Sequence, residues 1–277
     1  LRFYCRIWVV GKLKLYDYIM IAALVATWGL CVVNHYQLKY GTGQHAKDPN
    51  LPPDSTEATR ALLVGAATSW YTYQIVYIVA LALVKFSILF FYLTIATQRT
   101  FRILVVISIF VVAIFSTTMI FINAFECPKH PSFALTPGIF VYREKMQCFK
   151  LPSLYFSQAG INMFTDTAIL VLPMPILVKL RMPTLKRISL LVVFGVGLLV
   201  PIASGLRIWG LYLWATSGNL TRYYGGYVLF WSQVELNTAI VTASAPSLQP
   251  LFRQIFGQLS RFQRTHNPYY YYGGQRT

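Results

Sequence analysis

Six long stretches of almost uninterrupted apolar residues constrain this chain more than any other feature. Each reaches or exceeds the roughly 20 residues that a helix needs to cross a hydrocarbon core about 30 Å thick. They are Tyr18–Gln37, Ala61–Gln98, Ile103–Phe125, Leu151–Val178, Ile188–Leu220 and Tyr223–Phe252. Lipid offers no hydrogen-bond partners, so such segments must be helices or barrel strands, and they lack the apolar–polar alternation of barrel strands. We therefore predict an all-α, polytopic bundle of transmembrane helices.

The composition argues against an ordinary soluble domain. Of the 277 residues, 56% are hydrophobic and 12% are charged, whereas soluble domains carry about 25% charged residues. Too little polar surface remains to cover a water-soluble fold. Because the chain opens with Leu1 rather than Met, we expect it to be a piece of a longer protein.

The basic residues predict the orientation of the bundle. They concentrate at the two chain ends and in alternate loops, and cytoplasmic loops of membrane proteins carry such an excess. These residues are Arg2, Arg6, Lys12, Lys14, Arg99, Arg102, Lys179, Arg181, Lys186, Arg187, Arg253, Arg261, Arg264 and Arg276. We interpret them as a solvated rim facing lipid headgroups. Nucleic-acid binding would require one continuous basic face with stacking aromatics, so we expect no nucleic-acid partner.

Six spans place both chain ends in the cytoplasm. If one more helix precedes Leu1, the bundle is of the seven-helix type with its first helix missing. On this topology Arg99, Lys186 and Arg261 share one side, and Lys47 and Lys145 lie on the other.

Cys127 and Cys148 bracket the longest loop, on the predicted outer side. Disulfides persist in that compartment, so we predict a bond between them; two free thiols are the alternative. Zinc would need more ligands than the nearby His130 adds. Asn219-Leu220-Thr221 matches a glycosylation acceptor on the same side.

The C-terminal region contains one more amphipathic segment. Leu248–Phe262 places apolar residues on one helical face and polar residues on the other, which predicts an interfacial helix along the inner leaflet. A short helix that docks elsewhere is the alternative. We therefore expect a transmembrane domain over residues 1–262 and a disordered cytoplasmic tail over residues 263–277.

The sequence lacks the common motifs of enzymes, among them G-x-S-x-G, HExxH and a complete P-loop. We expect no enzymatic activity, no catalytic residues, no metal and no cofactor. Four ionisable residues nevertheless lie inside the apolar stretches, where each costs at least about 2.5–3.5 kcal/mol unless it finds a partner in the bundle. They are Lys85, Asp166, Arg207 and Glu235.

Two asparagines extend this charged set. Asn162 precedes Asp166 by one helical turn, and Asn237 is close to Glu235 in the sequence. The set is either an interhelical ion-pair network that fixes packing or a ligand or ion site. Lys85, Asp166 and Glu235 lie at similar depths, so we predict that Lys85 pairs with one of the two carboxylates.

Several motifs carry a family resemblance. In chain order they are Leu1–Arg6, Tyr16-Asp17-Tyr18, Lys85-Phe86-Ser87-Ile88-Leu89, Cys127-Pro128 with Cys148, Asp166 with Leu172-Pro173-Met174-Pro175, Arg207, Glu235-Leu236-Asn237, and Pro246 with Pro250-Leu251. Together they resemble the fungal rhodopsin-domain integral membrane proteins over nearly the whole chain, although Tyr16 stands where that family commonly has a second acid. The resemblance implies a seven-helix, receptor-like architecture, shared with proposed fungal G-protein-coupled receptors and with membrane proteins encoded near toxin gene clusters.

Three functional hypotheses follow. The first is a plasma-membrane receptor that senses an extracellular small molecule and signals through helix rearrangement, with a heterotrimeric G protein as candidate partner. The second is a transporter or channel that uses the charged set, but the internal repeats typical of transporters are not evident. The third is a membrane-bound accessory protein of a secondary-metabolite pathway. The sequence argues against retinal, because its Schiff base needs a lysine, conventionally in the final helix, and Tyr223–Ser247 has none.

Overall fold

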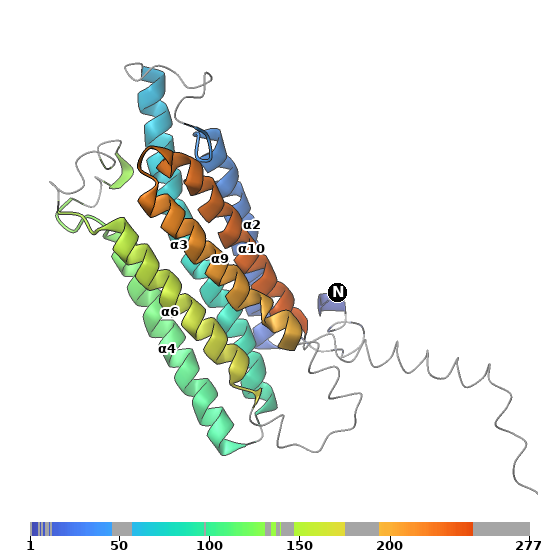
Figure 1. Ribbon diagram of the computed structural model, residues 1–277. Coiled ribbons are helices and arrows are strands. Elements are labelled where there is room, and N and C mark those ends of the chain that lie inside the picture. Colours follow the sequence, from blue (N-terminus) through green and yellow to red (C-terminus); the bar gives the residue numbers. More distant parts are fainter. Residues whose placement is uncertain are drawn as a thin grey trace, which may run out of the picture.

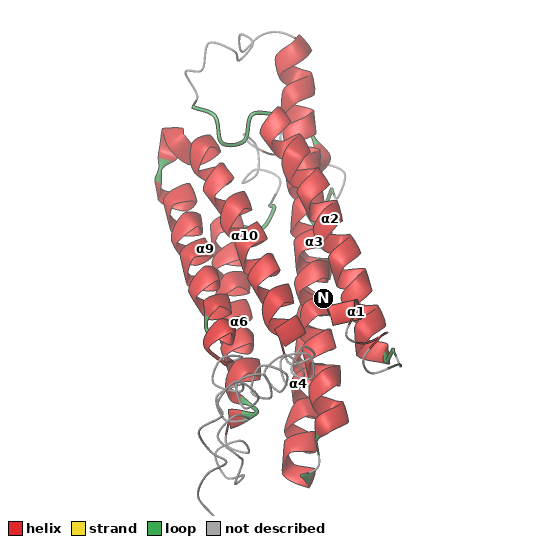
Figure 2. Ribbon diagram, turned by 90° about the vertical axis from the view of Figure 1, so that its right-hand side faces the viewer, coloured by secondary structure: helices red, strands yellow, loops and turns green. Residues whose placement is uncertain are grey.

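The computed structural model of the chain is a bundle of long helices (Figures 1 and 2). It describes residues 2–4, 6, 8, 11, 13–45, 57–96, 98–130, 134–136, 139, 147–174 and 194–245. No strand occurs in this part of the chain, so the predicted all-α fold is confirmed. The helices are α1 (Arg2–Tyr4), α2 (Leu15–Lys39), α3 (Glu57–Ile95), α4 (Arg99–Ala124), α6 (Leu151–Val171), α9 (Leu199–Thr216), the short 3₁₀ helix η3 (Gly218–Leu220) and α10 (Thr221–Ser244).

Each predicted apolar stretch overlaps one long helix in the described part of the chain. Four helical stretches among the described residues are long and apolar enough to span a membrane: Leu15–Lys39, Thr59–Ile95, Arg99–Ala124 and Phe194–Thr216. The other two, α6 and α10, have similar lengths and run alongside them (Figure 1). Buried polar side chains make α10 less apolar, because its inward face carries Ser232 and Glu235.

Local chemistry sets several helix boundaries. Asp17, in the first turn of α2, accepts a hydrogen bond from the Lys14 backbone N–H at 3.2 Å, which satisfies a donor that helices leave unpaired at this end. Helix α6 ends at Val171, just before Pro173, because proline has no backbone N–H to donate to the helical ladder. Phe194–Gly197 is helical, and a turn at Leu198 separates it from α9. Pro201 accounts for this break, since it cannot donate to the ladder.

The bundle has an apolar exterior, and it buries polar and charged side chains within a largely hydrophobic core. Helix α2 packs mainly on α3, α3 on α4, and α9 on α10 and α6. Large apolar side chains such as Trp28 on α2 and Phe110 on α4 are exposed, whereas several charged side chains are buried. Lipid solvates an apolar exterior of this kind, and the polar groups satisfy one another inside.

The two ends of the bundle are distinct. We call the end that carries Cys127 and Cys148 the disulfide end; the opposite end is where α2 begins and α10 finishes. The predicted interfacial helix Leu248–Phe262 and the tail 263–277 lie outside the described residues, as do Lys47, Lys145, Lys186 and Arg261. The domain boundary at residue 262 and the predicted membrane topology therefore stay predictions.

Candidate functional site

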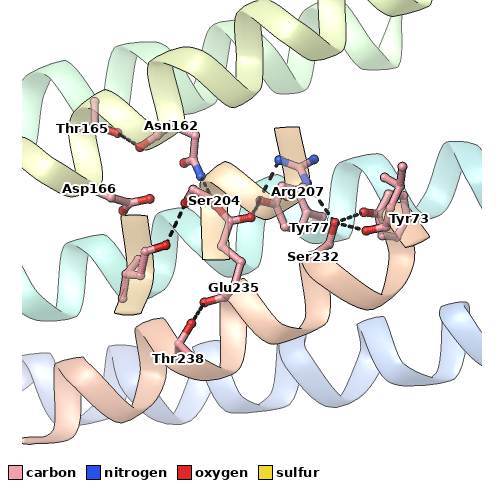
Figure 3. A network of polar contacts seen from close by, with 12 residues as sticks. Tyr73, Tyr77, Asn162, Thr165, Asp166, Ser204, Arg207, Ser232, Glu235 and Thr238 are labelled. Atoms are coloured by element: carbon pink, nitrogen blue, oxygen red, sulfur yellow. Dashed lines mark hydrogen bonds and ion pairs between the residues drawn. The ribbon is translucent and has the colours of Figure 1, made fainter. Parts of the chain in front are cut away.

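The structure brings all four intramembrane charged residues into one buried network. Lys85 comes from α3, Asp166 from α6, Arg207 from α9 and Glu235 from α10. Figure 3 shows that the side chains of Asp166, Arg207 and Glu235, with neutral polar neighbours, form a row between these helices. Lys85 is 5% exposed and Glu235 is 1% exposed. The network therefore ties four helices together in the middle of the bundle.

One half of the network surrounds the Lys85 ammonium. Its Nζ lies 3.2 Å from Asp166 Oδ1 and donates to Asn162 Oδ1 at 2.5 Å and to Thr165 Oγ1 at 2.7 Å. The predicted pairing with a carboxylate is thus present, and Asp166 rather than Glu235 is the partner. The other oxygen of Asp166, Oδ2, is buried without a hydrogen-bond partner among the described residues. Asp166 therefore depends on Lys85 for most of its stabilisation.

The other half surrounds the Glu235 carboxylate. Its Oε1 accepts hydrogen bonds from Asn162 Nδ2 at 2.9 Å and from Ser204 Oγ at 2.5 Å. Its Oε2 accepts a hydrogen bond from the Tyr77 hydroxyl and lies 3.8 Å from an Arg207 nitrogen. Four donors from three other helices thus satisfy a charge that would otherwise be costly to bury.

Arg207 completes this half. Its Nε donates to Ser232 Oγ at 2.9 Å, which also accepts from the Tyr73 hydroxyl at 2.5 Å. The guanidinium lies over the Tyr77 ring, 4.0 Å from the centroid, a cation–π geometry that stabilises a desolvated cation. Arg207 is therefore held by charge, hydrogen bonding and stacking together.

Asn162 joins the two halves. Its amide nitrogen donates to Glu235, and its side-chain oxygen accepts from Lys85. The ion pairs Lys85–Asp166 and Arg207–Glu235 give a set that is neutral if fully ionised. Removing one partner of a buried pair strands the other charge, which is strongly destabilising. A relative movement of these helices must therefore exchange partners within the network rather than release one charge.

The sequence prediction missed some members of the network and included one residue that is not in it. Asn237 is exposed, because two residues along a helix are about 200° apart around its axis. It therefore lies outside this network. The missed members are neutral and polar: Tyr73, Tyr77, Thr165, Ser204 and Ser232. Helical spacing could have identified two of these members. Ser204 precedes Arg207 and Ser232 precedes Glu235 by three residues, and residues three apart are neighbours on one face of a helix.

A second buried ionic cluster lies at the end of the bundle opposite the disulfide end, where α2 begins and α10 finishes. Arg2 and Arg6 are 5% and 9% exposed and lie 3.1 and 3.8 Å from the oxygens of Asp17, which is fully buried. Arg2 also donates to the Ala243 carbonyl at 2.8 Å and to Ser87 Oγ at 3.4 Å. The interpretation of Arg2 and Arg6 as a solvated rim is therefore wrong. Instead they connect the start of the chain to α2, α3 and α10.

The predicted disulfide is confirmed. Cys127 and Cys148 are bonded, with their Cα atoms 4.2 Å apart. The bridge packs against Ala67 of α3 and Ile139 of the loop. It therefore anchors part of the loop onto the bundle.

Two cavities accompany these features. A cavity of about 330 Å³ lies at the disulfide end, lined by Trp70, Trp214 and Arg222 among others, and neither Lys85 nor Glu235 lines it. A much smaller one of about 20 Å³ borders Lys85 and Asn162, which is room for one water molecule. No group of three or more His, Cys, Asp or Glu side chains in the described ranges is placed to hold a metal ion.

Comparison with known proteins identifies the family. The model of the fungal rhodopsin domain matches residues 1–254. This chain belongs to the fungal rhodopsin domain family. It is therefore a multi-pass membrane protein, and the resemblance noted in its sequence motifs is confirmed. No solved structure matches the chain significantly.

Two curated fungal proteins are similar to this family member. Receptor GIN3 of Arthrobotrys oligospora is 26% identical over 257 residues, which covers 91% of this chain and 57% of the receptor. Fugralins biosynthesis cluster protein 2 of Gibberella zeae is 25% identical over 108 residues, 39% of this chain and 27% of that protein. The chain thus spans little more than half the length of the first relative and about a quarter of the second. These similarities support a receptor-like or accessory membrane protein.

Proposed function

We propose that this protein is a receptor-like sensor of the plasma membrane, with the disulfide end outside the cell and the C-terminus in the cytoplasm. The observation that carries the proposal is the buried network that links α3, α6, α9 and α10 through two ion pairs. A switch needs an element with two discrete arrangements whose balance a ligand can shift. Exchange of partners around Asn162 and Glu235 supplies such arrangements without stranding a charge. The similarity to a protein named as a receptor also supports the proposal of a receptor-like sensor.

A physical route joins the large cavity to this network. Trp70 lines the cavity, and its ring lies 5.6 Å from the Tyr73 ring in the next turn of α3. The Tyr73 hydroxyl donates to Ser232, which also holds Arg207. A ligand that displaces Trp70 therefore perturbs the Arg207–Glu235 half of the network. On the cytoplasmic side, the partner that we propose is a heterotrimeric G protein.

The surroundings of Lys85 support the proposal that no retinal is bound. Its ammonium is held by Asp166, Asn162 and Thr165, and the adjoining cavity of about 20 Å³ is far too small for a polyene. The residues present do not fit a Schiff-base cofactor. The lack of catalytic motifs in the sequence supports a non-enzymatic role.

The small cavity beside Lys85 favours a second candidate function, a proton or ion relay. One water there would border both Lys85 and Asn162. Chains of ionisable residues with water are typical of pumps and transporters. The similarity to a biosynthesis cluster protein makes an accessory role in a secondary-metabolite pathway a third candidate.

One experiment separates receptor from relay. The full-length protein is expressed with a fungal G protein, and nucleotide exchange on the Gα subunit is measured for wild type and for Lys85→Met/Asp166→Asn. Neutralising this half of the network should change the basal exchange rate, whereas Arg99→Met, at an exposed site, should leave it unchanged. Unchanged exchange in both variants, together with proton flux into liposomes that depends on Lys85, would contradict the receptor and support the relay.

A further inference from the structure

The cavity at the disulfide end has the dimensions of a ligand site. Its volume of about 330 Å³ falls in the range of small-molecule pockets. Its walls come from α3, α6, α9 and α10 and from the loop that the disulfide closes. Ile139 lines the cavity and packs with Cys127 and Ala67. The disulfide therefore holds one wall of a largely preformed site.

Aromatic rings line one region of this cavity. The rings of Trp70 and Trp214 stack with centroids 5.9 Å apart and planes 16° apart. The Trp70 indole N–H donates to the Tyr155 hydroxyl at 2.9 Å, so this donor is engaged and the surface that Trp70 offers is apolar. Aromatic surfaces prefer offset or edge contacts with other rings. The lining therefore favours a planar, apolar ligand over a flexible chain.

One cation gives the cavity a polar anchor. Arg222, in the first turn of α10, lines the cavity and is half-buried. In the described part of the chain its guanidinium donates to one acceptor, the Tyr40 carbonyl at 3.0 Å, although a guanidinium carries five N–H donors. Glu126 also lines the cavity and already has an interaction of its own. The remaining Arg222 donors match the geometry of a carboxylate.

We infer that this cavity binds a planar, largely apolar small molecule whose carboxylate contacts Arg222. Its ring system lies against Trp70 and Trp214. That the ligand triggers signalling rests on the proposed receptor function. That the ligand binds in this cavity does not depend on it. Binding and signalling can therefore be tested separately.

The test uses three probes and the protein in lipid nanodiscs. Radiolabelled naphthalene-2-carboxylate, its methyl ester and decanoate are each equilibrated across a dialysis membrane, and uptake by empty nanodiscs is subtracted. The ester removes the charge, and decanoate keeps the charge but replaces the rings with a flexible chain. Wild-type protein should bind the naphthoate saturably and one to one. The ester should bind at least about tenfold more weakly, the loss expected for one charge-assisted contact, and decanoate should bind more weakly because it lacks the rings that contact Trp70 and Trp214.

Variants assign the binding to this cavity. Arg222→Gln should weaken the naphthoate about tenfold and leave the ester unchanged, whereas Arg60→Gln, at an exposed site in the first turn of α3, should change neither. Ala66→Phe and, separately, Leu63→Phe fill the cavity and should abolish binding; two positions are used in case one variant fails to fold. Folding is checked by circular dichroism and size-exclusion chromatography.

Several results would overturn the inference. The inference fails if the wild type shows no saturable naphthoate binding, or if binding survives in the folded cavity-filling variants. It also fails if the acid and the ester bind with equal affinity. Decanoate that binds as tightly as naphthoate would contradict it too and would indicate a lipid-like occupant. Failure of binding overturns this site alone. If the site binds as described but the Lys85→Met/Asp166→Asn variant leaves nucleotide exchange unchanged, the receptor function fails and the site stands.

Discussion

Replacing Lys85 and Asp166 singly and together gives the sharpest energetic test of the central network. In Asp166→Asn the ammonium keeps oxygen acceptors on Asn162 and Thr165, so we expect a loss of about 2 kcal/mol in the free energy of unfolding. In Lys85→Met the Asp166 carboxylate loses its cation while its Oδ2 already lacks a hydrogen-bond partner among the described residues. We expect a loss of about 4 kcal/mol there.

The double variant Lys85→Met/Asp166→Asn should lose about 3 kcal/mol, because no charge is stranded but the Asn162 and Thr165 acceptors lose their donor. Additive effects would give about 6 kcal/mol, so the expected coupling is about 3 kcal/mol. Titration with SDS in mixed micelles, followed by circular dichroism, measures all three. Lys85→Met combined with Arg99→Met, an exposed site, serves as the additive control. Additivity of the Lys85 and Asp166 changes would refute the pairing.

Two further predictions concern the ends of the bundle. Replacing Cys127 and Cys148 with serine should lower the free energy of unfolding by about 3 kcal/mol in the chain-entropy model, seen as a lower Tm that matches the reduced wild type. Asp17→Asn should cost about 3 kcal/mol in the same SDS titration, because it leaves Arg2 and Arg6 buried without their carboxylate; a loss below about 0.5 kcal/mol, as at exposed sites, would favour the solvated-rim interpretation.

Sequence reasoning predicted the centre of the bundle well because charged side chains inside apolar segments must face the bundle interior and pair there. Counting residues from the span ends placed Lys85, Asp166 and Glu235 at similar depths, and the structure pairs Lys85 with Asp166. The sequence left Glu235 open as an alternative partner because depth alone does not give helix order. The structure resolves this by placing Glu235 next to Arg207, with Asn162 between the two halves.

The parts that sequence reasoning missed follow from its reliance on charge and proximity. Arg2 and Arg6 lie near a span end, where a rim position is the usual outcome, and only the tertiary fold brings both to Asp17. Neutral members such as Ser232 are too common in membrane helices to stand out. Asn237 was included because it adjoins Glu235 in the sequence, although the helical period places it on another face.

The central claim is that the network holds α3 and α6 in one of two arrangements. Its most direct test is the distance between spin labels at Ile95 and Val171, exposed residues near the ends of these two helices. The labels are attached in a background with Cys5 and Cys31 replaced by serine, in lipid nanodiscs, and the distance is measured by double electron–electron resonance. We predict one narrow distribution for the wild-type network and a second, shifted population in Lys85→Met/Asp166→Asn, with Arg99→Met matching the wild type. An identical distance distribution in a folded Lys85→Met/Asp166→Asn protein would contradict the claim. It would indicate that the network only fixes the packing of the helices.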